Sequence, residues 1–442
     1  MDTMRRWRGL KALIHDAVDA TVDLVREGHE STSRGVMRVT DELGSLEKPA
    51  RAVDGLRRVA TDGVLGTIKV VNRAVEALSD VGIDAASQLV LTARARDAAS
   101  APDGVVTGAS RAVPMRSDVL DSATWAADAA LGLVNAAVGD HLHATQSGLD
   151  LGMELRAGDR YVSATAPALA DALPDATTRV ALFVHGLATT EWSWCLQSES
   201  YWGDPSVCFG TLLARDLGMT PLYIRYNTGR HISENGRQLA SLLDELVSAY
   251  PAQPVELTLI GHSMGGLVLR SAAHYAERQG LAWPAHVKRI FYLGSPHQGA
   301  PLAKFGQMLT DAFDVVDLPA TQILARILEK RSAGVQDLRH SPIVDEEWLA
   351  PNALPQDALP LPHATHHFVS ATLTTDKEHP VSQLMGDLLV QVPSASGPKM
   401  KDSTFAIDTS HYGGVMHHEL QNHPAVYEQV RRACAGGPDP KP

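Results

Sequence analysis

The most constraining feature of this sequence is an alternation, beginning near residue 150, between short apolar runs and segments with helical spacing. Between the second and third runs, Ser233 to Ala249 carries leucines at three- and four-residue intervals and is expected to be a helix. Such alternation is typical of an α/β fold class, with a mostly parallel central sheet and helices on both faces. The expected strands are Val180 to Val184, Pro221 to Tyr226, Val255 to Ile260, Val287 to Leu293 and His367 to Ala371.

The residues before this alternation follow a helical pattern instead. Apolar side chains recur at helical intervals from Leu10 to Leu24 and from Val64 to Leu78, and an alanine-rich stretch runs from about Asp118 to Val138. These stripes favour helices that pack on one another or on the following domain. The first helix carries Trp7 and several arginines, so peripheral contact with a membrane or lipid surface is an alternative interpretation.

Charge is distributed unevenly along the chain. Residues 1–100 hold 15 basic and 15 acidic side chains, so the net charge of −12 lies entirely in the remainder. An acidic second part disfavours nucleic acid as a partner, because a phosphate backbone requires a basic surface. The even balance in the first hundred residues also weakens the lipid-surface interpretation.

Neither the cysteines nor the N-terminus indicate export. Cys195, Cys208 and Cys434 show no disulfide framework and no metal-ligand spacing, so no metal is expected and free thiols are favoured. A Cys195–Cys208 pair is the alternative in an oxidising compartment. Charged side chains from Lys11 onward interrupt the segment that is apolar in a signal peptide, and no run of about 18 apolar residues occurs. A cytoplasmic protein without a transmembrane helix is therefore expected.

A G-x-S-x-G turn follows the third expected strand. Gly261-His262-Ser263-Met264-Gly265 comes directly after the apolar run Leu257 to Ile260 and before the helical pattern Leu267 to Leu269. A nucleophilic serine in a strained strand–turn–helix requires small residues on both sides, because the backbone and a neighbouring strand approach closely. The turn also places a developing negative charge at a helix N-terminus. Ser263 is the expected nucleophile, and this context makes the short motif more specific.

Two backbone donors are needed to stabilise the negative oxygen that forms when a serine attacks a carbonyl group. The Met264 N–H, directly after the serine, is one expected donor of this oxyanion hole. The first expected strand ends in His185-Gly186-Leu187, where the chain turns sharply, and the Leu187 N–H is the other. His185 precedes the serine in the chain and is interpreted as packing beneath this site, not as the catalytic base.

The other members of a serine triad on this type of sheet follow the serine in the order acid, then histidine. Asp387 lies in the turn Gly386 to Val390 and is the expected acid. Its competitors are Asp376, Asp402 and Asp408. Several histidines precede the last expected helix, Val426 to Ala433, and the residues alone leave the choice of base open. The four are His411, His417, His418 and His423.

Several segments together carry a family resemblance. They are Phe183 to Leu187, Pro221 to Gly229, His231 to Gly236, the serine turn, and Leu293 to Pro301. From about Gly139 to Ala433 the chain resembles the bacterial esterase/lipase branch of the α/β-hydrolase superfamily, a branch that is similar to the GPI inositol-deacylase-like lipases. The resemblance implies the α/β-hydrolase fold and an ester substrate.

The resemblance also orders the remaining triad candidates. In that family the acid sits in a Gly-Asp-Gly-Leu-Val turn, which Gly386 to Val390 matches with leucine in place of the second glycine. The family histidine is followed by an apolar residue, an acidic residue and leucine, and later by Pro-x-Val-Tyr. His417 fits this register, and His418 then occupies the apolar place. The resemblance therefore implies a catalytic triad of Ser263, Asp387 and His417.

These residues imply a serine carboxylic ester hydrolase that forms an acyl-enzyme on Ser263 and needs no cofactor. Apolar side chains in the segment from about 300 to 362 favour a channel beneath a cap or lid, and so small-molecule or lipid esters as substrates. A rigid cap or an inert loop is the alternative.

The rival functions are an acyltransferase with a non-water acceptor and a non-catalytic helical binding protein. The expected organisation is an N-terminal helical region over residues 1–145, an α/β-hydrolase catalytic domain over 146–435 with a cap insertion at about 300–362, and a disordered tail over 436–442.

Overall fold

The structure is a computed structural model of the 442-residue chain, and it describes residues 122–253, 255–299, 332–338, 341–349, 361–372 and 406–436. Within these ranges, helices and strands alternate along the chain around one central sheet. The helical stretches expected before residue 100, most of the expected cap, the turn around Asp387 and the expected C-terminal tail after Gly436 lie outside the described residues.

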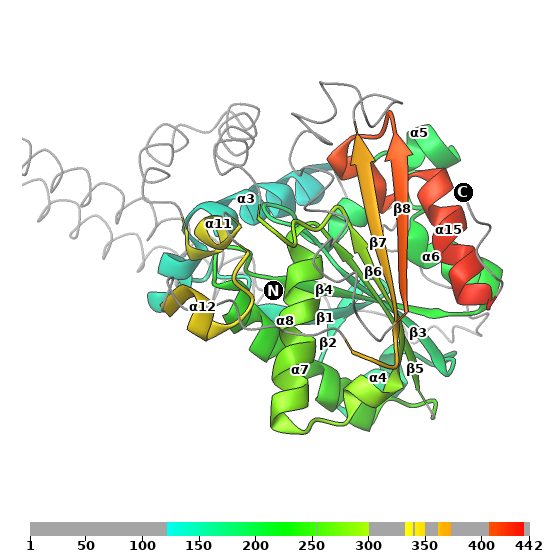
Figure 1. Cartoon of the computed structure of the whole chain (residues 1–442), viewed down its shortest axis with the longest axis horizontal. Coiled ribbons are helices and arrows are strands. Elements are labelled where there is room, and N and C mark those ends of the chain that lie inside the picture. The colour runs from blue at the N-terminus through cyan, green and yellow to red at the C-terminus, as the bar shows by residue number, and fades with distance from the viewer. Residues whose placement is uncertain are drawn as a thin grey trace, which may run out of the picture. The chain divides into compact units, whose positions relative to one another are not determined.

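Within the described part of the chain, eight strands form the central sheet. They are β1 (Met153–Ala157), β2 (Arg160–Val162), β3 (Arg179–Val184), β4 (Thr220–Tyr226), β5 (Glu256–His262), β6 (Val287–Leu293), β7 (Thr365–Thr372) and β8 (Ile407–Gly413). Their order across the sheet is β2-β1-β4-β3-β5-β6-β7-β8 (Figure 1). Strands β3 to β8 run parallel to their neighbours, whereas β1 pairs antiparallel with β2 and β4. The strand order departs in opposite directions from β3, and ligands of open α/β sheets bind at the carboxyl ends of strands beside such a point.

Helices cover both faces of this sheet. The longer ones are α3 (Ser122–Ala144), α6 (Phe209–Leu217), α7 (Ile232–Ala249), α8 (Met264–Gln279) and α15 (Pro424–Ala435), and the shorter ones are α4 (Ala166–Ala172), α5 (Ser198–Trp202), α11 (Ala333–Asp337) and α12 (Asp345–Leu349). Three 3-10 turns are η1 (Glu191–Cys195), η2 (Trp283–His286) and η5 (His417–Gln421). Figure 1 shows α7 and α8 on one face of the sheet and α6 and α15 on the other.

The central strands lie between these helix layers because they are apolar on both faces. Every residue of β3 after Arg179 is buried, and so is every residue of β5 after Glu256. On the α6 and α15 side, the Phe183 ring contacts Trp194 edge-on, with 4.9 Å between centroids, and stacks on Tyr223 at 5.0 Å. This layer positions the carboxyl ends of β3 and β5 side by side, where the site described below is found.

The structure confirms the five expected strands to within two residues at each end, and the expected helix is confirmed as α7. Strands β1, β2 and β8 were not expected from the sequence; β2 and β8 are the two edges of the sheet, and β1 lies next to the edge. In β1 and β8, polar side chains such as Glu154, Arg156, Asp408 and Ser410 interrupt the apolar pattern. Strands at or next to an edge are only partly covered and need fewer apolar residues, so their signal in the sequence is weaker.

The alanine-rich stretch near residue 130 is confirmed as a helix and continues beyond Val138, where the backbone departs from helical geometry, to Ala144. This helix, α3, packs in the same compact unit as the sheet. The Asn227 side chain donates a hydrogen bond to the Gly139 carbonyl at 2.8 Å, and the Leu151 N–H donates to the Asn135 side chain at 3.1 Å. None of the described helices has the length and hydropathy needed to cross a bilayer.

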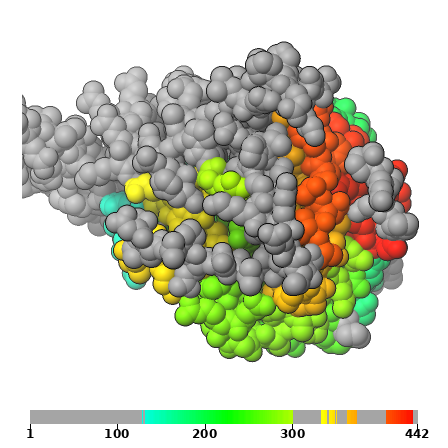
Figure 2. All heavy atoms as spheres, in the orientation of Figure 1, coloured from blue at the N-terminus to red at the C-terminus, as the bar shows by residue number. Residues whose placement is uncertain are grey.

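Two short helices within or next to the expected cap are attached to α7 and α8. On α12, Asp345 pairs with Arg237, and Glu346 pairs with Arg278 at 3.1 Å. Asp337 of α11 accepts the Ile232 N–H at 2.9 Å at the start of α7. The space-filling view shows α11 and α12 in yellow beside the green surface of the α7–α8 layer (Figure 2).

Candidate active site

Ser263 lies in a sharp turn between β5 and α8. Its φ of 53° and ψ of −123° lie outside the helical and extended regions, and a positive φ is costly for a residue with a side chain. The neighbouring glycines make the turn possible by close approach. A Cβ at Gly265 would overlap the carbonyl oxygens of Val184 and His185, and one at Gly261 would lie 2.6 Å from the Gly266 nitrogen. The strand–turn–helix expected from the sequence is therefore present.

The end of β3 lies directly against this turn. A Cβ at Gly186 would be 3.0 Å from the Ser263 Cβ, so only a glycine fits this contact without displacement. Leu187 follows immediately and is buried. It belongs to the loop of residues 185–190 that joins β3 to η1, and this segment is called the β3–η1 loop below. Met264 is the first residue of α8, so its N–H is among those without an intrahelical acceptor. Met264 therefore directly follows Ser263 in the chain, and Leu187 directly follows the glycine that contacts Ser263.

His417 approaches Ser263 from the opposite end of the chain. It is the first residue of η5, and its side chain is buried. The Ser263 N–H donates to the Leu293 carbonyl at 2.8 Å, and a Cβ at the next residue, Gly294, would lie 3.1 Å from the His417 Nδ1 and Cε1 atoms. The backbone of Leu293 and Gly294 therefore contacts both residues, and the structure brings Ser263 and His417 together.

His262 forms a second link between the serine turn and His417. Its Nε2 atom lies 3.0 Å from the His417 carbonyl oxygen, and the two imidazole rings are 4.8 Å apart. Burial, and then the proximity of His417, hold the pKa of His262 well below its usual value. The ring is therefore neutral, with the proton on Nε2 donated to the carbonyl. The His262 Nδ1 atom has no hydrogen-bond partner among the described residues.

The other three histidines proposed for this position have different surroundings. His411 contacts Ser370 and Thr372 through its two ring nitrogens, at 3.1 and 3.0 Å. His423 accepts the Ala425 N–H at the start of α15. His418 is half-buried, and its pKa is lowered by burial. His417 is the histidine whose ring contacts the Leu293–Gly294 backbone beside Ser263.

The acidic member of the expected triad, Asp387, lies outside the described residues, as do Asp376 and Asp402. Asp408 is described, and its carboxylate has other partners. It bonds to the His367 Nδ1 at 3.0 Å and accepts from the Gln429 side-chain amide at 3.2 Å. Asp408 is the second residue of β8 and pairs in register with His367, near the amino end of the parallel strands. Because the serine turn lies at the carboxyl ends, this geometry separates Asp408 from Ser263.

His185 is the first residue of the β3–η1 loop, and both of its ring nitrogens form hydrogen bonds. The Tyr226 N–H donates to Nε2 at 3.3 Å, so the proton resides on Nδ1, which donates to the Gly186 carbonyl at 2.9 Å. The ring stacks on Tyr226 with 4.5 Å between centroids. Burial lowers the pKa of His185 to about 4. These contacts agree with the interpretation of His185 as a packing residue.

A buried ionic network that sequence analysis missed adjoins the β3–η1 loop. Glu191 accepts from Arg225 Nε at 2.7 Å and Nη2 at 2.8 Å, from Arg156 Nη1 at 3.1 Å and from the Tyr161 hydroxyl at 2.6 Å. Asp128 of α3 accepts from Arg225 Nη2 at 2.9 Å. Burial alone would raise the pKa of Glu191, but the two arginines outweigh it and lower this pKa. An arginine inside the otherwise apolar strand β4 was the available sequence signal.

His297 is partly buried, and the cysteines are buried. The His297 ring is edge-on to Tyr292 and Phe368, with centroids 4.9 and 5.0 Å away, and burial holds its pKa well below the usual value. The three cysteines are buried and form no disulfide: Cys195, Cys208 and Cys434. No group of three or more potential metal ligands occurs among the residues that the structure describes.

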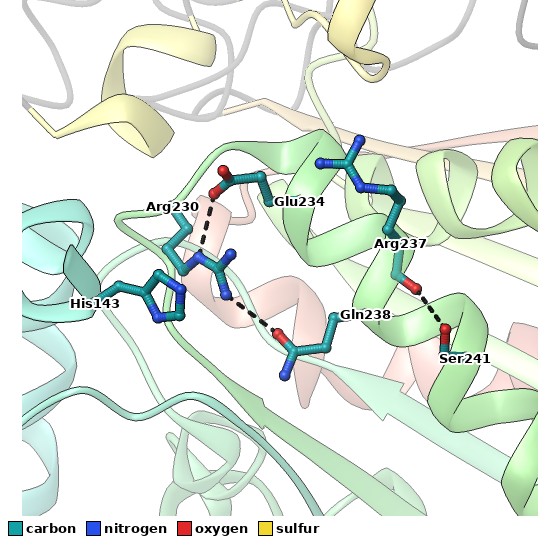
Figure 3. A pocket seen from close by; sticks show the side chains of 6 residues that line it. All are labelled: His143, Arg230, Glu234, Arg237, Gln238 and Ser241. Atoms are coloured by element: carbon teal, nitrogen blue, oxygen red, sulfur yellow. Dashed lines mark hydrogen bonds and ion pairs between the residues drawn. The ribbon is translucent and has the colours of Figure 1, made fainter. Parts of the chain in front are cut away.

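One shallow pocket, of about 410 Å³, lies over α7 and is lined by polar side chains. Figure 3 shows Arg230 extending between His143, Glu234 and Gln238, whereas Arg237 points away from them. Arg230 donates to Glu234 at 3.2 Å and to Gln238 at 3.4 Å, so its charge is already compensated. The lining has neither the apolar surface that an acyl group requires nor any residue of the Ser263 site.

Residues 176–392 match the family described as a PGAP1-like alpha/beta domain. The fold is identified by this match together with the mostly parallel sheet and the serine turn. The chain has the α/β-hydrolase fold. The expected fold class and the family resemblance are therefore confirmed. No curated protein matches the sequence.

Similar solved structures include the mature lipase BlEst2 from Bacillus licheniformis, at 18% identity and a TM-score of 0.39, covering 63% of this chain and 97% of that one. The RedJ thioesterase of the prodiginine pathway from Streptomyces coelicolor has 15% identity, coverage of 59% and 91%, and a TM-score of 0.36. An esterase from Pyrobaculum calidifontis has 12% identity, coverage of 72% and 92%, and a TM-score of 0.36. At these low identities and TM-scores, the likenesses assign neither a substrate nor a residue role.

Proposed function

We propose that this protein is a serine carboxylic ester hydrolase of the esterase or lipase type, with Ser263 as nucleophile, His417 as general base and Asp387 as the acid. The observation that carries the proposal is the meeting of Ser263 and His417 at the Leu293–Gly294 backbone. A strained serine beside a buried imidazole, at the carboxyl edge of a parallel sheet, is the arrangement that nucleophilic acyl transfer requires.

In the first half of the proposed reaction, the Ser263 Oγ attacks the ester carbonyl carbon while His417 accepts the hydroxyl proton. The carbonyl oxygen becomes negative and is stabilised by the N–H groups of Leu187 and Met264. The position of Gly186 against Ser263 supports this role for the β3–η1 loop. The intermediate then expels the alcohol, which takes its proton from His417, and an acyl-enzyme remains.

In the second half, a water molecule loses a proton to His417 and attacks the acyl carbon. The same two N–H groups stabilise the second intermediate, which releases the carboxylic acid as Ser263 regains its proton. Asp387 is proposed to hold the imidazole in the correct tautomer and to stabilise its protonated form. No step requires a metal or an organic cofactor.

The proposed substrates are esters with an apolar acyl group, including lipid esters. This part rests on the sequence of the expected cap, in which Phe305, Leu309 and Phe313 belong to an apolar series. Hydrolysis rates for p-nitrophenyl esters of increasing acyl length, with and without a lipid–water interface, test it. A rate that falls steadily from acetate to longer chains would contradict an apolar acyl channel.

The nucleophile is tested with Ser263→Ala in the full chain. We expect kcat for p-nitrophenyl butyrate to fall by at least about 10³-fold, because triad serines contribute factors of this size or larger. Ser241→Ala is the matched control, since the Ser241 hydroxyl bonds only to the Arg237 carbonyl of its own helix, and it should keep full activity. A fully active Ser263→Ala protein would end the proposal. Adding an alcohol acceptor and measuring ester formation separates hydrolysis from acyl transfer.

A further inference from the structure

Helix α3 precedes the family-matched segment, residues 176–392, yet it contacts the backbone beside the proposed oxyanion hole. The contact is made at Gly132. A Cβ at this position would lie 3.1 Å from the Thr189 carbonyl carbon and oxygen and 3.2 Å from the Ala188 carbonyl oxygen. These residues follow Leu187, whose N–H is the proposed donor. A side chain at residue 132 would therefore push on the loop that aims this donor.

The β3–η1 loop is strained at the same place. Ala188 has a φ of 63°, which is unfavourable for a residue with a Cβ and persists only where neighbouring contacts impose it. The Ala188 N–H points to the Thr228 hydroxyl at 3.4 Å. Thr228 lies between Asn227, which bonds to the Gly139 carbonyl, and Gly229, whose Cβ would overlap the Asn135 carbonyl oxygen. Helix α3 thus contacts the loop directly and also contacts the segment that supports it.

The far end of the loop is fixed to α3 by charge. Asp128 accepts from the Trp192 indole N–H at 3.0 Å and from Arg225 Nη2 at 2.9 Å, and Arg225 also pairs with Glu191 at 2.7 Å. The side chains of Asp128, Arg225 and Glu191 are at most 6% exposed. Since Glu191 and Trp192 begin η1, this network holds the first residues after the loop.

We propose that α3 is a positioning element of the active site, in which Gly132 and Asp128 hold the β3–η1 loop so that the Leu187 N–H points at the place, next to Ser263, where the negative carbonyl oxygen of the substrate forms. The inference rests on the proposed ester hydrolase function and extends it to residues outside the family-matched segment. Neither Gly132 nor Asp128 contacts the substrate. Their effect is exerted on the transition state, because the loop donor is needed most when the carbonyl oxygen carries negative charge.

The test is Gly132→Ala in the full chain, assayed with p-nitrophenyl butyrate. The added methyl group displaces Ala188 and Thr189 by a few tenths of an ångström, so we expect kcat to fall about tenfold while KM changes by less than about twofold. Alanine is also a better helix former than glycine, so the thermal midpoint should not fall. A wild-type kcat in Gly132→Ala would overturn the inference.

Gly218→Ala is the matched control. Gly218 ends α6 with a φ of 61°, and a methyl group added there would have no atom within 4 Å, so alanine strains the backbone without touching the β3–η1 loop. We expect a lower thermal midpoint and an unchanged kcat. A tenfold loss of kcat in Gly218→Ala as well would mean that activity follows stability alone, and would also overturn the inference.

Asp128→Asn tests the ionic contact with the same shape and without the charge. We expect a lower kcat at unchanged KM in protein shown by circular dichroism to be folded at the assay temperature. An unchanged kcat in this variant would contradict the role of Asp128.

Hydrolysis that is absent from the wild-type chain, or that survives in Ser263→Ala, would overturn the proposed function and this inference together. Normal wild-type hydrolysis with an unaffected Gly132→Ala would overturn the inference alone.

Discussion

Glu191→Gln should destabilise the fold more than any exposed carboxylate substitution. Glu191 is fully buried and accepts four hydrogen bonds, from Arg225, Arg156 and Tyr161. Glutamine keeps the shape but removes the charge, and its amide hydrogens face donors instead of acceptors. Arg225 then keeps its pair with Asp128, whereas the ion pairs of Glu191 with Arg225 and Arg156 are both lost. Breaking a buried ion pair in this way costs about 3–5 kcal/mol, a large part of a total stability of about 5–15 kcal/mol.

The assay is urea unfolding followed by circular dichroism, with the free energy of unfolding extrapolated at a constant slope. Asp171→Asn is the control, because Asp171 is 75% exposed and pairs with Arg160, which is 50% exposed, at 2.9 Å. An exposed pair of this kind contributes at most about 1 kcal/mol. If Glu191→Gln lowered the free energy of unfolding by less than about 1 kcal/mol, as the control does, the prediction would be refuted. The charges of this network would then not depend on one another for stability.

The pH dependence of this difference gives a second check. The pKa of Glu191 is lowered in the folded state from its usual value of 4.5, because the attraction of Arg225 and Arg156 outweighs burial. A carboxyl group with a depressed folded pKa contributes stability that is complete above the unfolded pKa and is lost as the pH falls through the folded pKa. The gap between wild type and Glu191→Gln should therefore be constant above about pH 5 and narrow below pH 4.5.

Three further predictions concern the histidines. Gly294→Ala places a Cβ 3.1 Å from the His417 ring, at a residue with a φ of 64°. The kcat of steady-state ester hydrolysis should therefore fall about 10- to 100-fold. An unchanged kcat would contradict the packing of His417 against Gly294. His262→Phe removes the hydrogen-bond donor to the His417 carbonyl and should lower kcat about tenfold. His262→Gln should recover part of this activity, because its amide can donate. Equal activity of the two variants would argue against a role for this hydrogen bond. Burial lowers the pKa of His185 and of His366 to about 4. Each histidine therefore contributes on the order of 3 kcal/mol of folding stability, which is present above pH 6.5 and is lost as the pH falls towards 4. Urea midpoints that are equal at pH 7 and pH 5 would contradict this.

Strands could be predicted from the sequence where both faces of the strand are buried. Val180 to Val184 is an apolar run that lies within one residue of the limits of β3, because a strand covered on both faces by helices is apolar along its length. Strand β1, which lies between β2 and β4, could not be found in this way. Its Arg156 is polar in the sequence, and its burial depends on Glu191, which lies 35 positions away. Such compensation between distant charges leaves no local pattern.

The same distinction applies to the site. Ser263 could be predicted because strand, turn and helix are contiguous in the sequence, and the turn chemistry is local. His417 could be separated from its neighbours only through family register, since nothing local distinguishes adjacent histidines. Arg225 inside an apolar strand was a signal for a buried partner, but the link to Asp128 spans 97 positions and no local pattern identifies that partner. Local chemistry is therefore predictable from the sequence, whereas the support that positions it depends on the three-dimensional fold.

The most direct test of the central claim is covalent labelling of the full chain with a fluorophosphonate, which reacts with activated serines, followed by peptide mass spectrometry. We expect one adduct, on Ser263, that forms at the rate at which ester hydrolysis is lost and that is absent from Ser263→Ala. Labelling of a different serine, or complete inhibition with Ser263 unmodified, would show that Ser263 is not the nucleophile.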